Sequence, residues 1–178
     1  MLFRSDGARY LVAHVMEVPQ EDPSVERHLA SFLDYYEAHA VDYTVLMPHA
    51  EEVMAALADR PLALCTNKSR RTTLAVLDGL GISARFRVVV AGGDTIQNKP
   101  SAEPLLLAAE QLGVQPAELI MVGDGPQDIE AARAAGAFGV GLRGGILPIE
   151  RLLAASPQAL LDDLSELPAL VRELDRAS

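Results

Sequence analysis

The sequence contains one cysteine, no tryptophan and only 4% aromatic residues. Because Cys65 stands alone, no disulfide can form within the chain, and we predict a cytoplasmic protein. The apolar runs are too short to span a bilayer, so we expect no membrane partner. Acidic residues outnumber basic ones by 25 to 15, the net charge is −10, and no cluster of Lys and Arg stands out. Since nucleic-acid backbones are bound by basic patches, we expect no nucleic-acid partner.

Hydrophobic residues make up 49% of the 178 residues, which is enough to form a core. Up to about residue 45 their spacing is helical, with one helix over 6–16 and a second helix that Ser24 would cap. After Pro48, short apolar runs alternate with helical stretches. We predict strands at 62–65, 86–90, 119–122, 138–142 and near Leu160, and helices at 51–57, 69–80, 102–112, 127–135, 149–153 and from Ser165 onward.

This alternation predicts an α/β fold, a Rossmann-like parallel sheet with helices on both faces. We expect residues 46–178 to form the sheet domain and residues 1–45 to form a helical pair beside it. In an open parallel sheet, ligands bind beyond the carboxyl ends of the strands. The polar residues that directly follow strands are therefore the candidates for a functional site.

The stretch 118–136 contains the clearest of these candidates. Asp124 follows the predicted strand 119–122 in a Gly-Asp-Gly turn, and Asp128 lies in the first turn of the next helix. Two carboxylates at the end of a buried strand suit Mg²⁺, which prefers oxygen ligands. The alternative interpretation makes Asp124 a turn residue and Asp128 a charge that interacts favourably with the helix dipole.

Two further strand ends supply complementary groups. Thr66 and Asn67 directly follow the predicted strand 62–65, and Lys99 lies in the loop after the strand 86–90. A hydroxyl, an ammonium and two metal-binding carboxylates would hold and orient a phosphoryl group and stabilise its charge during transfer. Taken singly, Thr66 is also explained as a helix cap and Lys99 as a solvated loop residue. The convergence of three strand ends favours the phosphoryl site.

These motifs resemble those of a known family. Thr66-Asn-Lys, Lys99-Pro and the stretch 123–136 are similar to the second, third and fourth motifs of the haloacid-dehalogenase-like (HAD) phosphatases, and especially of the phosphoglycolate phosphatases. The resemblance implies that Thr66 and Lys99 are catalytic, and that both bind phosphate together with Asn67. It also implies that Asp124 and Asp128 hold Mg²⁺, and that the substrate is a small phosphorylated metabolite such as 2-phosphoglycolate. Residues 1–45 resemble part of the helical cap of these enzymes.

The first motif of the family, Asp-x-Asp-Gly-Thr after an apolar strand, is not found. Residues 3–8 align with it only if Arg4 replaces the nucleophilic aspartate. We therefore expect a truncated or degenerate chain that begins inside the cap and lacks the central strand, between the strands that end at Thr66 and Gly123. Such a chain should show little or no phosphatase activity, and it should either be marginally stable or self-associate to complete its sheet. The alternative function is a non-catalytic module that binds phosphate and a metal.

Cys65 and Arg71 form a rival motif, because their Cys-x5-Arg spacing matches that of cysteine-dependent phosphatases. The loops of those enzymes wrap backbone amides around the phosphate, whereas this segment has no glycine and no preceding histidine. We favour a buried strand cysteine instead.

Overall fold

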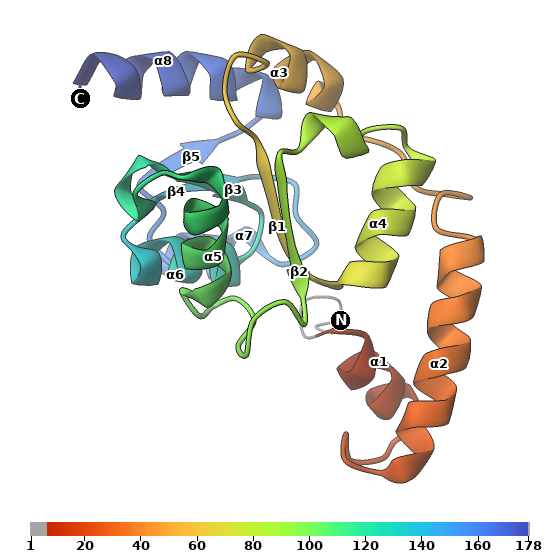
Figure 1. Cartoon of the computed structure of the whole chain (residues 1–178). Coiled ribbons are helices and arrows are strands. Elements are labelled where there is room, and N and C mark those ends of the chain that lie inside the picture. Colours follow the sequence, from red (N-terminus) through yellow and green to blue (C-terminus); the bar gives the residue numbers. More distant parts are fainter. Residues whose placement is uncertain (1–6, 178) are drawn as a thin grey trace.

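The computed structural model describes residues 7–177, in which helices and strands alternate along most of the chain (Figure 1). The elements are α1 (Ala8–Val15), α2 (Pro23–Ala38), α3 (Ala50–Ala56), β1 (Ala63–Ser69), α4 (Arg70–Gly79), β2 (Val88–Gly92), α5 (Glu103–Leu112), β3 (Ile120–Gly123), α6 (Pro126–Ala135), β4 (Phe138–Leu142), α7 (Ile149–Ala154), β5 (Ala159–Leu161) and α8 (Leu167–Ala177). Short 3₁₀ turns precede β2, β3 and α8. No helix in the described range is both long and apolar enough to cross a membrane.

Most predicted elements are present, with shifted ends. The strand predicted at 138–142 is confirmed to the residue as β4, whereas β1 extends past the predicted end at Cys65 to Ser69. The predicted cap of α2 is wrong: the side chain of Asp22, not Ser24, caps the helix by accepting the Ser24 N–H at 2.8 Å. The final helix begins at Leu167 because the residues before it form a 3₁₀ turn. The start predicted for the first helix, at residue 6, lies outside the described residues.

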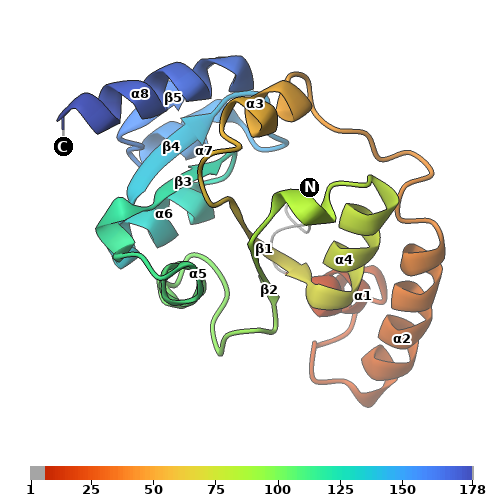
Figure 2. The same cartoon turned by 45° about the horizontal axis from the view of Figure 1, so that its top comes forward.

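The strands form two parallel sheets rather than one. β1 pairs with β2, and β3 pairs with β4, which pairs with β5. Within residues 7–177 no ladder joins β1 to β3, so each keeps one free edge. Figures 1 and 2 both show β1 and β2 standing apart from β3–β5. The inner strand β3 is only partly buried along its whole length, whereas four of the five residues of β4 are fully buried.

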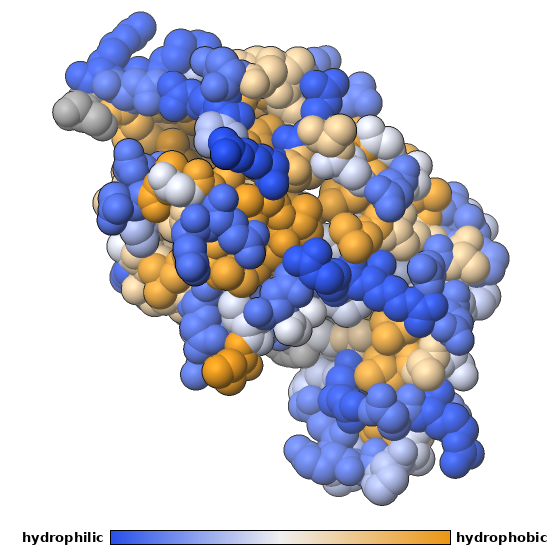
Figure 3. All heavy atoms as spheres, viewed as in Figure 1, coloured by the Kyte–Doolittle hydropathy of each residue, from blue (hydrophilic) through white to orange (hydrophobic). Residues whose placement is uncertain are grey.

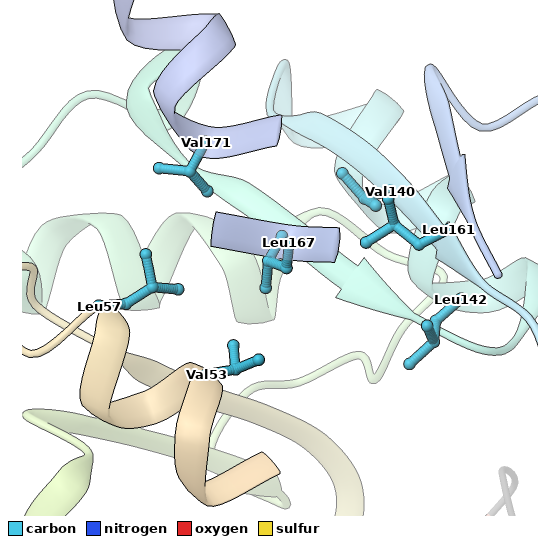
Figure 4. Close-up of a cluster of buried hydrophobic side chains, with 7 residues drawn as sticks. All are labelled: Val53, Leu57, Val140, Leu142, Leu161, Leu167 and Val171. Atoms are coloured by element: carbon cyan, nitrogen blue, oxygen red, sulfur yellow. The ribbon is translucent and has the colours of Figure 1, made fainter. Parts of the chain in front are cut away.

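Helices cover both faces of the β3–β5 sheet, as predicted. On one face, α3 and α8 pack on β4 and β5 through a cluster of aliphatic side chains shown in Figure 4: Val53, Leu57, Val140, Leu142, Leu161, Leu167 and Val171. Burial of each such side chain contributes about 1.5–3 kcal/mol to stability. On the opposite face, α5 and α6 pack on β3 through Leu105, Ala131, Ala132 and Met121. Because Cys65 of β1 joins this second cluster, α5 connects the two sheets.

Helices α1 and α2 pack against each other through Val12, Ala13 and Val25, together with Leu29 and Phe32. In Figure 3 this pair forms a mainly hydrophilic lobe at the lower right of the view. Arg71 of α4 connects α2 to the rest of the protein through ion pairs with Asp34 and Glu37. The described residues before 46 contain no strand, in keeping with the predicted helical pair. The division into domains at residue 45 stays a prediction.

Candidate active site

A pocket of about 680 Å³ lies between the two sheets. Its walls come from the facing strands β1 and β3, and from the helical pair through Leu11, Phe32 and Tyr36. Every residue predicted for the site lines this pocket: Thr66, Asn67, Lys99, Asp124 and Asp128. A second cavity of about 440 Å³, formed by residues 44–47, residues 49–52 and Leu80, contains none of them. The structure thus brings the ends of three strand segments together, as the strand-end argument predicted.

Thr66 lies in a bulge of β1. Cys65 is opposite Val90 and Ser69 is opposite Gly92, so three residues of β1 face one residue of β2. The bulge requires glycine at position 92, because a Cβ there would lie 2.4 Å from the Asn67 carbonyl oxygen. The Thr66 hydroxyl accepts the Lys68 N–H at 3.1 Å, and no described group accepts its own proton. Thr66 can therefore donate that proton to a ligand oxygen.

Asn67 aligns the lysine of the site. Its side-chain amide donates to the Lys99 carbonyl oxygen at 2.8 Å, and its side-chain oxygen accepts the Lys99 N–H at 3.0 Å. The Lys99 ammonium in turn donates to the Cys65 carbonyl oxygen at 2.6 Å and to Asp128 Oδ1 at 2.7 Å. Asn67 therefore holds the backbone of Lys99 in register with β1. Its predicted contact with phosphate stays a prediction.

Asp128 is the counter-ion of Lys99. The two side chains are 8% and 7% exposed, so they form a buried ion pair. The second oxygen of Asp128 accepts the Gly125 N–H at 3.1 Å, which also caps α6. Gly123 makes room for this carboxylate, because a Cβ there would lie 2.3 Å from it. Both oxygens of Asp128 thus have protein partners.

Asp124 is the solvent-accessible carboxylate of the pocket. It is exposed, and within residues 7–177 it has no hydrogen-bond or ion-pair partner. The described residues contain no group of three or more His, Cys, Asp or Glu that would hold a metal by themselves. Mg²⁺ is commonly held by one or two carboxylates plus waters and substrate phosphate. The pocket fits this mode, with Asp124 as the accessible ligand and Asp128 beside it.

The cysteine hypothesis does not fit this geometry. Burial raises the pKa of the Cys65 thiol, with a smaller opposing effect from Lys99. Because the thiolate is the nucleophile, a raised pKa lowers the reactivity of Cys65 at neutral pH. The side chain of Arg71 pairs with the carboxylates of α2 and does not line the pocket.

Sequence analysis missed the pair formed by Lys68 and Tyr36. Tyr36 belongs to α2. In the structure its hydroxyl accepts a hydrogen bond from the Lys68 ammonium, which also lies 4.4 Å from the centre of its ring. The two residues are 32 positions apart, and no local pattern connects them.

The fold and the pocket define an α/β protein with a polar pocket at the carboxyl ends of parallel strands. Residues 6–136 match the family model described as haloacid dehalogenase-like hydrolase. The chain therefore belongs to this family, and the resemblance found in its motifs is confirmed. The chain is 37% identical over 158 residues to the phosphoglycolate phosphatase of Escherichia coli K12, and 38% identical over the same length to that of Salmonella typhimurium.

These alignments cover 86% of this chain and 62% of each relative, so the chain spans less than two thirds of their length. The fold is also similar to the crystal structure of a predicted phosphoglycolate phosphatase from Haemophilus somnus 129PT. That comparison has a TM-score of 0.82 with 24% identity, and covers 95% of this chain and 79% of the other. At this level of identity, the structural comparison supports the fold alone.

Proposed function

We propose that the chain carries most of the active site of a Mg²⁺-dependent phosphomonoester hydrolase that acts on a small phosphorylated metabolite such as 2-phosphoglycolate. The observation that carries the proposal is the convergence of Thr66, Lys99 and Asp124 on the pocket between β1 and β3. The names of the relatives support the choice of substrate. The cytoplasmic location expected from the sequence belongs to the same proposal.

Each side chain has a definite task in this proposal. The hydroxyl of Thr66 donates to a phosphoryl oxygen, and the ammonium of Lys99 neutralises the charge that develops there. Asn67 and Asp128 hold Lys99 in place. When bound at Asp124, Mg²⁺ supplies a Lewis acid for a second phosphoryl oxygen.

The nucleophile must come from the space between the two sheets. The free edges of β1 and β3 both line the pocket, and among residues 7–177 its only carboxylates are those of Asp124 and Asp128, which are assigned to other tasks. We propose that a further parallel strand fills this space and carries an aspartate, as the resemblance implies. Its carboxylate oxygen would bond to phosphorus while the ester P–O bond breaks, and the alcohol would leave with a proton from the second aspartate of the Asp-x-Asp motif. That aspartate would then take a proton from water, which hydrolyses the acyl phosphate and releases inorganic phosphate. In the self-associated form of the chain, a second copy would fill the same space by pairing with the free edges of β1 and β3.

The test is a phosphatase assay with 2-phosphoglycolate and an aryl phosphate in the presence of Mg²⁺. We expect the 178-residue chain to show little or no turnover, and an added N-terminal segment with Asp-x-Asp-Gly-Thr to restore it. In the restored protein, Lys99→Ala should abolish turnover. Robust turnover by the chain alone that persists in Asp124→Asn would contradict the proposal. If the extended protein binds phosphate but stays inactive, the second candidate, a non-catalytic binding module, is favoured.

A further inference from the structure

Two lysines line the pocket, and their partners differ. Lys99 forms a buried ion pair with Asp128. The ammonium of Lys68 instead donates to the hydroxyl of Tyr36 and lies over its ring. Among the residues from 7 to 177, no carboxylate lies within ion-pair distance of Lys68. A positive charge on the pocket wall thus has only a neutral aromatic partner.

The backbone holds Lys68 in this position. Its N–H donates to the hydroxyl of Thr66 at 3.1 Å, and its carbonyl oxygen accepts the hydroxyl of the buried Thr73 at 3.2 Å. The bulge of β1 that carries Thr66 therefore also fixes the backbone of Lys68. An ammonium has three N–H donors, and Tyr36 accepts one of them. The other two can be offered to a ligand in the pocket.

The neighbouring basic residues have different partners. Arg70 donates to Asp94, with its Nε 2.8 Å from Oδ1. Arg71 pairs with two carboxylates of α2, those of Asp34 and Glu37. Neither arginine lines the pocket. Of the basic residues between positions 66 and 71, Lys68 alone faces the pocket without a carboxylate partner in the described structure.

We propose that Lys68 binds a carboxylate of the substrate while the phosphate lies at Thr66 and Lys99. The inference rests on the proposed function and narrows its substrate class to short phosphate monoesters with a second acidic group. Thr66 and Lys68 belong to the same bulge, so the two acidic groups of the substrate must be only a few atoms apart. Tyr36, which belongs to α2, positions the Lys68 ammonium. Helix α2 would therefore contribute to substrate selection.

The experiment compares two ligands by isothermal titration calorimetry with Mg²⁺ present. 2-Phosphoglycolate carries both acidic groups, and ethyl phosphate has the same chain length without the carboxylate. The variants are Lys68→Met, which removes the charge at similar length, Lys68→Arg, which restores a cation, and Arg71→Met. The last is the matched control, because it also removes a contact with α2 but lies outside the pocket.

We expect the unaltered chain to bind 2-phosphoglycolate about tenfold more tightly than ethyl phosphate, because a hydrogen-bonded charge pair contributes roughly that factor. Lys68→Met should abolish the preference and leave the affinity for ethyl phosphate unchanged. Lys68→Arg should retain part of the preference, and Arg71→Met should retain all of it.

Three results would refute the role of Lys68 without refuting the proposed phosphate site. These are equal affinities of the unaltered chain for both ligands, an equal loss of both in Lys68→Met, and the same selective loss in Arg71→Met. If the unaltered chain binds neither ligand, the proposed phosphate site fails, and the assignment of Lys68 fails with it.

Discussion

Replacement of Lys99 by Met removes one member of the buried ion pair and leaves the Asp128 carboxylate without its cation. Both side chains are less than 10% exposed, and their charged atoms lie 2.7 Å apart. Loss of one partner of a buried pair costs about 3–5 kcal/mol. A whole domain is stable by only about 5–15 kcal/mol, so Lys99→Met and Asp128→Asn should each remove a large part of the total.

The double variant Lys99→Met/Asp128→Asn completes a cycle that measures the interaction energy between the two side chains. It leaves no unpaired charge, so its free energy of unfolding should exceed the additive expectation by about 2 kcal/mol. Urea unfolding followed by circular dichroism measures all four proteins, since the chain has no tryptophan to report by fluorescence. The buffer contains EDTA, so that metal binding does not contribute.

The control is Asp175→Asn, which breaks the ion pair between Arg60 and Asp175. These side chains are 42% and 46% exposed, and such surface pairs contribute less than about 1 kcal/mol. If Lys99→Met and Asp128→Asn cost no more than this control, or if their effects simply add, the buried pair does not hold the site together and the argument fails.

Three further predictions concern single residues. Mg²⁺ should raise the melting temperature of the chain increasingly as its concentration rises, and Asp124→Asn should abolish the response; a variant that still responds would show that Asp124 is only a turn residue. Burial raises the pKa of Cys65, so iodoacetamide should label the native thiol at pH 7 far more slowly than the thiol in urea, and rapid native labelling would contradict this. Arg70 holds the pKa of Asp94 below its ordinary value of 3.8, so the resulting stability is present above pH 3.8 and is lost as the pH falls through the lowered pKa. The difference in melting temperature between Asp94→Asn and the unaltered chain should therefore shrink on acidification, whereas a constant difference would refute the effect.

The sequence predicted which residues lie close together, but not the hydrogen bonds and ion pairs that they form. Thr66 lies in the last part of β1, Lys99 follows β2 and Asp124 follows β3, and the parallel direction of these strands accounts for their convergence on the pocket. The pairing of Lys99 with Asp128 was not predictable, because strand-end logic locates a residue without choosing its partner. Asp128 was assigned to a metal site, and this assignment stays a prediction; the structure adds that its oxygens accept hydrogen bonds from Lys99 and from the Gly125 N–H.

Contacts between residues that are far apart in the sequence could not be predicted from local sequence patterns. Asn67 bonds both backbone groups of Lys99, and this depends on how the loop after β2 returns to β1. The contact of Lys68 with Tyr36 depends on where α2 docks on the sheet. The missing strand between β1 and β3 was expected only from the resemblance to the HAD phosphatases, since composition and periodicity alone predict one continuous sheet.

The free edges of β1 and β3 also bear on how the chain behaves in concentrated solution. An open strand edge presents amide and carbonyl groups that recruit strands from other molecules, and this is a common origin of aggregation. Turbidity and recovery after storage would therefore report on the occupancy of the space between β1 and β3, without any enzymatic assay. A peptide that fills this space should act as a solubilising additive, and its length and sequence could be optimised by light scattering alone.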